Sequence, residues 1–182
     1  MRDLPEFSTD GLLPVGDFAM TLQELALSRL VRGESKPNWD TEWRNKLVTN
    51  LGAMVNQLWQ VGISEIFVDG SFAEDKDHPN DIDGYFECDR KELASGRLEK
   101  SLNAIDPHKA WTWDPSERRS YLGYRKKQLP MWHVYRIEMY PHYGQLSGIR
   151  EKHGHELEFP AAFRTSRSGK EKGIIKIVKE QT

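Results

Sequence analysis

The strongest constraint on the fold comes from two short apolar segments, ISEIFVD at 63–69 and DIDGYFEC at 81–88, which an acidic loop separates. Both have the length and the β-branched and aromatic residues that are typical of strands. Side chains alternate between the two faces of a strand, so Asp81 and Asp83 would share one face while Ile82 points into the core. We therefore expect two neighbouring strands, the second of which opens with two carboxylates.

The rest of the chain alternates between helical and extended patterns. Capping residues and a three-to-four spacing of apolar residues predict helices at about 21–31, 40–62, 89–104 and 114–128. Apolar runs predict further strands at 131–140 and 173–180. This order of elements predicts an α+β fold in which a mixed β-sheet is flanked by helices.

The length of 182 residues fits a single domain, 1–182. Residues 1–20 are rich in turn-forming residues but carry scattered apolar anchors, so we expect an ordered N-terminal wrap over the core. At the other end, residues 163–182 are expected to form a basic hairpin followed by a C-terminal strand.

The composition narrows the class of protein. The chain has 26 basic and 28 acidic residues and a net charge of −2, which argues against a protein that coats nucleic acid by bulk charge but permits a local basic patch. A single cysteine, Cys88, excludes an internal disulfide and suits a reducing cytosol. The N-terminus lacks the apolar core of a signal peptide, and no run has the length of a membrane helix. We expect a soluble, cytoplasmic protein with no membrane partner.

Asp81 and Asp83 are candidate metal ligands, because two carboxylates on one strand face form the hard-oxygen site that Mg²⁺ or Mn²⁺ prefers. Such pairs also occur as solvated acidic loops and exposed strand ends. The preceding Gly70 would let the backbone turn tightly, and Ser71 can offer its N–H and hydroxyl to a phosphate. Together these residues favour a metal and nucleotide site over a solvated loop.

Other phosphate and metal motifs are excluded by their spacing. An EF-hand with Gly84 at its sixth position would place Pro79 first and Arg90 twelfth, and neither residue can supply the ligand required there. The sequence contains neither the P-loop nor the Rossmann glycine pattern.

A strand that ends in Gly70-Ser71, nine intervening residues, and then Asp81-Ile-Asp83 on a second strand resembles the nucleotidyltransferase fold of the DNA polymerase β superfamily. That resemblance implies a third carboxylate on a later strand, for which Glu138 in VYRIEMY is the candidate. Members of the superfamily more often have Asp there. The alternative for Glu138 is an edge-strand charge that pairs with Arg136 or a lysine.

Three blocks, LPEFSTDGLLPVGDFAMTLQEL, IFVDGSF…PNDIDGYF and FRTSRSGKEKGIIKI, resemble a narrower group of small, uncharacterised bacterial and phage proteins classed as minimal nucleotidyltransferases. These are related to the nucleotidyltransferases of toxin–antitoxin and abortive-infection systems. The resemblance covers most of the chain. It implies ATP or another NTP as donor, an RNA or protein acceptor, and a possible partner protein.

Two basic segments accompany the acidic residues. Arg164, Arg167, Lys170 and Lys172 precede the last strand and would hold a triphosphate or an RNA backbone, or else form a solvated hairpin that turns at 168–169. The second segment, 118–127, has five basic residues interleaved with tyrosines on the expected helix at 114–128, where they would meet a polyanion or face solvent.

These features predict a metal-dependent enzyme that moves a nucleoside monophosphate from an NTP to a hydroxyl on RNA, such as tRNA, or on protein. The expected catalytic and metal-binding residues are Asp81, Asp83 and Glu138; the expected nucleotide-binding residues are Gly70, Ser71, Arg164, Arg167 and Lys172. Two alternatives stay open. One is a catalytically silent protein of the same fold that binds a partner, and the other is a metal-dependent nuclease, which would not need the Gly-Ser turn.

Overall fold

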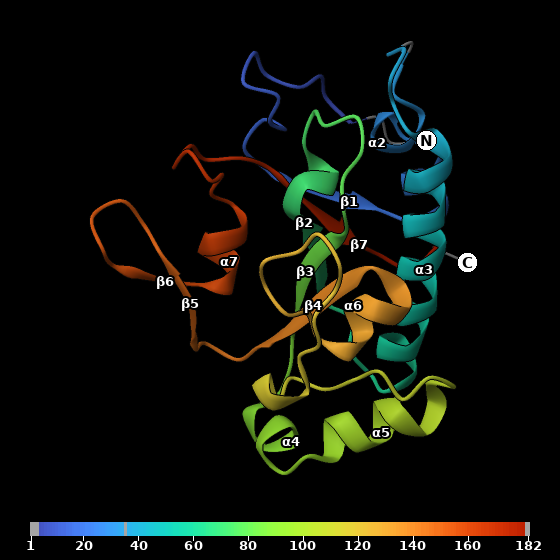
Figure 1. Cartoon of the computed structure of the whole chain (residues 1–182), viewed down its shortest axis with the longest axis vertical. Coiled ribbons are helices and arrows are strands. Elements are labelled where there is room, and N and C mark those ends of the chain that lie inside the picture. Colours follow the sequence, from blue (N-terminus) through green and yellow to red (C-terminus); the bar gives the residue numbers. More distant parts are fainter. Residues whose placement is uncertain (1–3, 35, 181–182) are drawn as a thin grey trace.

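A five-stranded mixed sheet forms the centre of the molecule in the computed structural model, which describes residues 4–34 and 36–180 (Figure 1). In spatial order the strands are β1 (Asp17–Met20), β7 (Ile174–Ile177), β2 (Ile66–Asp69), β3 (Ile82–Glu87) and β4 (Ile137–His142). β2 runs antiparallel to both of its neighbours, whereas the β1–β7 and β3–β4 pairs are parallel. The C-terminal strand therefore lies inside the sheet, between the first strand and the strand that leads to the acidic loop.

One face of the sheet packs against the long helix α3 (Thr41–Gln60). Asp40 caps this helix by accepting a hydrogen bond from the Trp43 N–H, and the buried residues Leu47, Leu51 and Leu58 line its inner face. Four shorter helices contact α3 as well: α1 (Leu22–Leu27), α2 (Arg29–Arg32), α5 (Arg97–Ile105) and α6 (Pro130–Tyr135).

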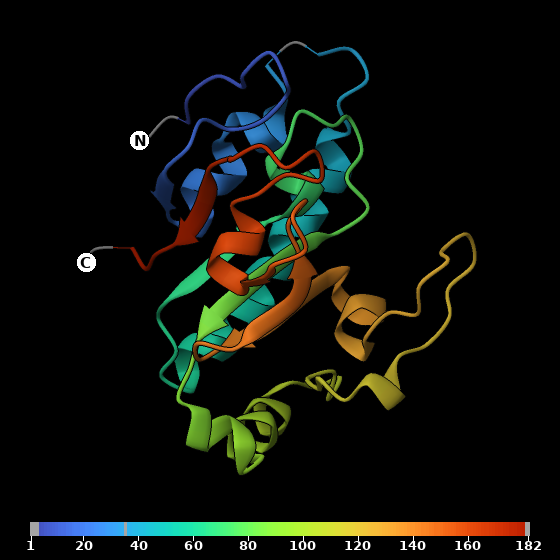
Figure 2. The same cartoon turned by 90° about the vertical axis from the view of Figure 1, so that its left-hand side faces the viewer.

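The opposite face is covered by α7 (Phe159–Phe163), which lies across the sheet from α3 in Figure 2. Phe159 and Phe163 join Phe67, Tyr85 and Ile174 of the sheet in a second apolar cluster. The remaining elements are the small sheet of β5 (Leu146–Arg150) and β6 (Glu156–Glu158), the helices α4 (Arg90–Ala94) and α5 (Arg97–Ile105), and the 3₁₀ turns η1 (Gly70–Ala73) and η2 (Pro115–Glu117).

The predicted α+β class with a mixed sheet is confirmed. The helix expected at 40–62 is α3, and the strands expected at 63–69, 81–88 and 173–180 are β2, β3 and β7. Thr165 pairs with Glu171, and the Gly169 N–H donates to the Ser166 carbonyl, as the predicted hairpin requires.

The helix predicted at 114–128 is wrong. Only η2 at 115–117 is helical, and the chain then runs out and back as an exposed arm whose two ends pair at Arg119 and Gln128. Gly123 takes a left-handed conformation with φ +85° in this arm. The segment has too few apolar residues to give a helix a buried face, so its capping signal produces only one turn. The basic residues do not share a helix face.

The strand predicted at 131–140 begins six residues late, at Ile137. Pro130 stands at the first position of α6, where its missing N–H and fixed φ favour a helix. Arg136 ends α6 in the left-handed conformation, with φ +60°, and redirects the chain into β4. Pro130, just upstream of the apolar run, therefore makes the first half of that run helical instead of extended.

Smaller differences follow from breaks in helices. The helix predicted at 21–31 is split at Ser28, whose hydroxyl donates to the Leu25 carbonyl, and the helix predicted at 89–104 is split at Gly96, with φ +72°. The N-terminal wrap ends in a strand, β1, and its first three residues lie outside the described part of the chain. Within 4–34 and 36–180, none of the helices has the length and apolar character that crossing a membrane requires.

Candidate functional site

Four carboxylates gather on the α7 face of the sheet. Asp69 at the end of β2 is paired in register with Asp83 of β3, and Asp83 is paired in register with Glu138 of β4. Residues paired in this way point to the same face, and Asp81, two residues before Asp83, points there too. The three acids that the sequence singles out thus lie together, and Asp69 joins them.

The crowding of these acids changes their protonation. Burial, together with the carboxylates of Asp81, Glu138 and Asp69, raises the pKa of Asp83 to about 8. Burial also raises the pKa of Asp81, and the Glu138 carboxylate adds to this effect. Like charges in a desolvated site disfavour each other's ionised form, so this group attracts positive charge.

The turn after β2 is built to come close to Asp83. Gly70 has φ +70°, and a Cβ added there would lie 2.7 Å from the Asp83 Oδ2 atom. No other residue type combines that backbone conformation with that approach. Ser71 follows in η1 and is partly exposed. The Gly-Ser turn and the acidic pair are therefore direct neighbours, as the sequence predicts.

A buried arginine of α3 holds the loop between the turn and Asp81. Arg44 is 0 % exposed, and its guanidinium donates to the carbonyls of Phe72 and Lys76 at 2.8 and 2.5 Å. Burial lowers its pKa to about 9, while the loop carboxylates of Asp75 and Asp77 oppose that change. Arg44 thus fixes the path of the acidic loop from beneath.

Glu138 is held by three donors. Its Oε1 atom accepts from the Leu129 N–H at 3.0 Å and from the Arg118 guanidinium at 3.2 Å, and its Oε2 atom accepts from the Tyr140 hydroxyl. The side chain is 5 % exposed. Glu138 therefore is not an exposed edge charge, and its cationic partner is Arg118 rather than Arg136. The guanidinium of Arg136 instead lies over the Trp132 ring, 4.0 Å from its centroid.

Asp69 and Lys172 form a buried ion pair at the same end of the sheet. The Lys172 Nζ atom lies 2.9 Å from the Asp69 carboxylate and 2.7 Å from the Glu74 carboxylate. The Lys172 side chain is 4 % exposed. Burial alone would lower the pKa of Lys172, but the two carboxylates outweigh it and raise the pKa. Lys172 thus compensates charge inside the protein and is not directed at a ligand.

Asp69 is a site residue that the sequence patterns above do not single out, although the sequence carries a signal for it. It ends the first strand directly before Gly70, and an antiparallel hairpin-like pairing would set it opposite Asp83. Its Oδ1 atom is buried and has no hydrogen-bond partner within the described residues. An unsatisfied buried carboxylate oxygen beside other acids points to a ligand or cation at this place.

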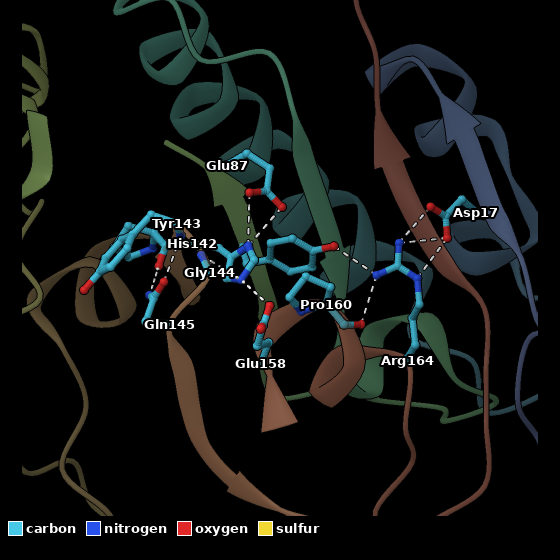
Figure 3. A network of polar contacts seen from close by, with 11 residues as sticks. Asp17, Glu87, His142, Tyr143, Gly144, Gln145, Glu158, Pro160 and Arg164 are labelled. Carbon is cyan, nitrogen blue, oxygen red and sulfur yellow. Dashed lines mark hydrogen bonds and ion pairs between the residues drawn. The ribbon is translucent and has the colours of Figure 1, made fainter. Parts of the chain in front are cut away.

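The cations of the hairpin differ in their surroundings. Arg164 donates to both carboxylate oxygens of Asp17, to the Tyr85 hydroxyl and to the Pro160 carbonyl (Figure 3). The same network includes His142, which contacts Glu87 and Glu158 (Figure 3). Arg164 is thus engaged with the protein itself. Arg167 is exposed and close enough to Asp81 and Asp83 to oppose the rise in their pKa.

Comparison with family models gives one finding: a family of unknown function, DUF6932, matches residues 5–178. The chain belongs to DUF6932. Comparison with curated proteins gives no match, and comparison with solved structures gives none.

A metal ion fits the donor chemistry of the site. Asp81 and Asp83 supply carboxylate oxygens; burial and the neighbouring carboxylates raise the pKa of Asp83, and a divalent cation would favour its ionised form. In the described part of this DUF6932 chain, no three His, Cys, Asp or Glu side chains are already arranged to hold an ion. Glu138 is engaged by its three donors, which leaves Asp81 and Asp83 as the pair that would hold the ion.

Proposed function

We propose that this protein transfers a nucleoside monophosphate from an NTP to a hydroxyl group. One observation carries the proposal: the tight turn at Gly70 lies against Asp83, which is in register with acids on both neighbouring strands. A turn that can face a phosphate, beside carboxylates that can bind a divalent cation, is the pair of features that nucleotidyl transfer needs.

In this proposal Asp81 and Asp83 hold Mg²⁺ or Mn²⁺. The ion, when bound, neutralises charge on the phosphates and polarises the reacting phosphorus. The backbone N–H groups and hydroxyl of the Gly70–Ser71 turn hold the β- and γ-phosphates, and the exposed guanidinium of Arg167 adds positive charge on the solvent side.

The reaction is a substitution at the α-phosphorus. The acceptor oxygen forms a bond to that phosphorus, the bond to the β-phosphate bridging oxygen breaks, and pyrophosphate leaves. The proton of the acceptor hydroxyl passes to a site carboxylate; Glu138 would take this role if its hydrogen bond from Arg118 were replaced by one from the acceptor hydroxyl. Burial raises the pKa of Asp69 to about 7, and Lys172 opposes this rise by pairing with the carboxylate; Lys172 takes no part in these steps.

The test is incorporation of label from α-³²P NTPs into total tRNA or total protein in the presence of Mg²⁺. We expect incorporation by the wild type and its loss in Asp81→Asn and Asp83→Asn. Asp77→Asn is the matched control, because Asp77 is an exposed aspartate of the same loop. Equal labelling by the wild type and Asp83→Asn, or no labelling of any acceptor by the wild type, would refute the proposal.

A second candidate is a silent protein of this kind that binds a partner. The observation that favours it is the engagement of Glu138 by Arg118, Leu129 and Tyr140. A ligand that binds only the folded state raises the melting temperature. An unchanged melting temperature with every NTP and Mg²⁺, combined with no labelling, would select this candidate.

A further inference from the structure

The arm at 118–128, which we call the basic arm, is unlike the rest of the surface. It has five basic and no acidic residues among eleven, in a chain whose net charge is −2. Its cations Arg119, Arg125, Lys126 and Lys127 are exposed. In Figure 2 the segment between η2 and α6 extends away from the sheet into solvent. A one-signed, protruding segment of this kind attracts a polyanion.

The basic arm also presents aromatic and apolar side chains. Tyr121 is 42 % exposed and Leu122 is 95 % exposed. The Tyr121 and Tyr124 rings meet the buried Trp132 ring edge-on, with centroids 5.2 and 4.9 Å away. These contacts fix the positions of the two rings, and the Arg136 guanidinium lies over the Tyr121 ring, 4.2 Å from its centroid. Rigid aromatic rings beside cations are the surface on which unpaired bases stack.

The basic arm and α6, which packs against it, are tied to the acidic site at two points. Arg118 donates to Glu138, and the Trp132 indole N–H donates to the Asp81 Oδ2 atom at 2.8 Å. The Arg136 guanidinium stacks on Trp132 and Tyr121 and so joins the arm to the start of β4. A ligand that lies along the arm therefore ends beside Asp81 and Glu138.

We propose that the basic arm binds a single-stranded polynucleotide and delivers its terminal hydroxyl to the acidic site. The inference rests on the proposed function in so far as it names the acceptor. Charge alone would suit any polyanion, but the exposed ring and the apolar tip favour unpaired bases over a duplex, whose bases are stacked on each other, and over an acidic peptide, which has no bases.

The experiment measures equilibrium binding by fluorescence anisotropy without NTP and with EDTA, so that it does not depend on catalysis. The probes are a labelled single-stranded RNA of about 12 nucleotides, the DNA of the same sequence, the RNA duplex of the same length, and a polyglutamate peptide. We expect the single strands to bind at least roughly tenfold more tightly than the duplex or the peptide. Equal binding of the duplex or the peptide would overturn the proposal.

Variants locate the binding surface. Arg125→Ser/Lys126→Ser/Lys127→Ser should weaken RNA binding roughly tenfold or more and reduce the slope of log K against log salt by about 2, because each single-strand phosphate contact contributes about 0.7. Lys91→Ser/Lys100→Ser/Lys152→Ser, which removes the same charge from exposed positions elsewhere, should leave the slope unchanged. Equal effects of the two triple variants would overturn the assignment.

Stacking is tested at Tyr121. Tyr121→Ser should weaken single-strand binding roughly 5- to 100-fold, and Tyr121→Phe should bind like the wild type. Circular dichroism separates loss of folding from loss of binding. RNA binding by the arm without label transfer to any acceptor would leave the assignment of the arm as a single-strand binding surface standing and refute both the proposed function and the delivery of a hydroxyl. If Arg125→Ser/Lys126→Ser/Lys127→Ser transferred label to RNA as well as the wild type does, this inference alone would be refuted.

Discussion

The crowded carboxylates at the ends of β2, β3 and β4 make the stability of the protein depend on pH through Asp83. Its pKa is raised to about 8, first by burial and then by Asp81, Glu138 and Asp69. In the unfolded chain the same carboxyl titrates near about 3.9. Between these values the folded state binds more protons than the unfolded state, so the free energy of unfolding falls as pH rises. Replacing Asp83 with Asn removes the titrating carboxyl, and with it this fall in the free energy of unfolding.

The magnitude follows from the size of the shift. Each pKa unit corresponds to about 1.4 kcal/mol, so the full rise to about 8 would amount to roughly 6 kcal/mol. Asp83 retains contact with solvent, which screens the repulsion from its neighbours. We therefore expect Asp83→Asn to be more stable than the wild type by about 2 kcal/mol at about pH 8, with a melting temperature higher by about 4–8 °C. The difference should vanish towards about pH 4.

The assay is thermal unfolding followed by circular dichroism in EDTA, from about pH 4 to about pH 8.5. Asp77→Asn serves as the control and should stay within about 0.5 kcal/mol of the wild type at every pH. Added Mg²⁺ should narrow the difference between the wild type and Asp83→Asn, because the ion binds the ionised site. A wild type that is as stable as Asp83→Asn at about pH 8 would refute the view that these carboxylates repel each other.

Two further perturbations test the neighbours of Asp83. Gly70→Ala should abolish nucleotidyl transfer and lower the free energy of unfolding in urea by about 1–3 kcal/mol, because its Cβ would lie 2.7 Å from the Asp83 Oδ2 atom; Gly96→Ala, with a similar φ and open space, should keep the activity. Lys172→Met should lower the free energy of unfolding by about 3–5 kcal/mol, since it leaves Asp69 buried and unpaired. Adding Asp69→Asn to Lys172→Met should restore much of this loss, and an additive loss would contradict the ion pair.

Local sequence patterns predicted the elements that bear the acidic pair. β3 follows from alternation, which sets Ile82 on the core side and Asp81 and Asp83 on the other. The cap at Asp40 and the apolar spacing behind it predicted α3 because both signals agree over many turns. A glycine directly after a strand predicts a tight turn, and Gly70 has the positive φ that such a turn uses.

Sequence patterns failed where distant contacts decide the structure. Nothing local indicates that Lys172 pairs with Asp69 or that Arg164 pairs with Asp17, because those partners meet only when β7 enters the sheet. The cations of the hairpin look alike in sequence, yet burial turns Lys172 inward and leaves Arg167 in solvent. The sequence predicts a helix through the basic arm because Asp114 caps the single turn at 115–117, directly before the arm.

The position of β7 in the sheet sets an order of assembly during synthesis. Among the residues that the structure describes, β1 pairs only with β7, and β2 borders β7 on one side. A nascent chain on the ribosome therefore exposes the edges of both strands until residue 177 has emerged. Lys172 directly precedes β7 and reaches Asp69 only then. Asp69 therefore lacks its lysine partner until β7 joins the sheet, so this part of the acidic site forms only when the sheet closes.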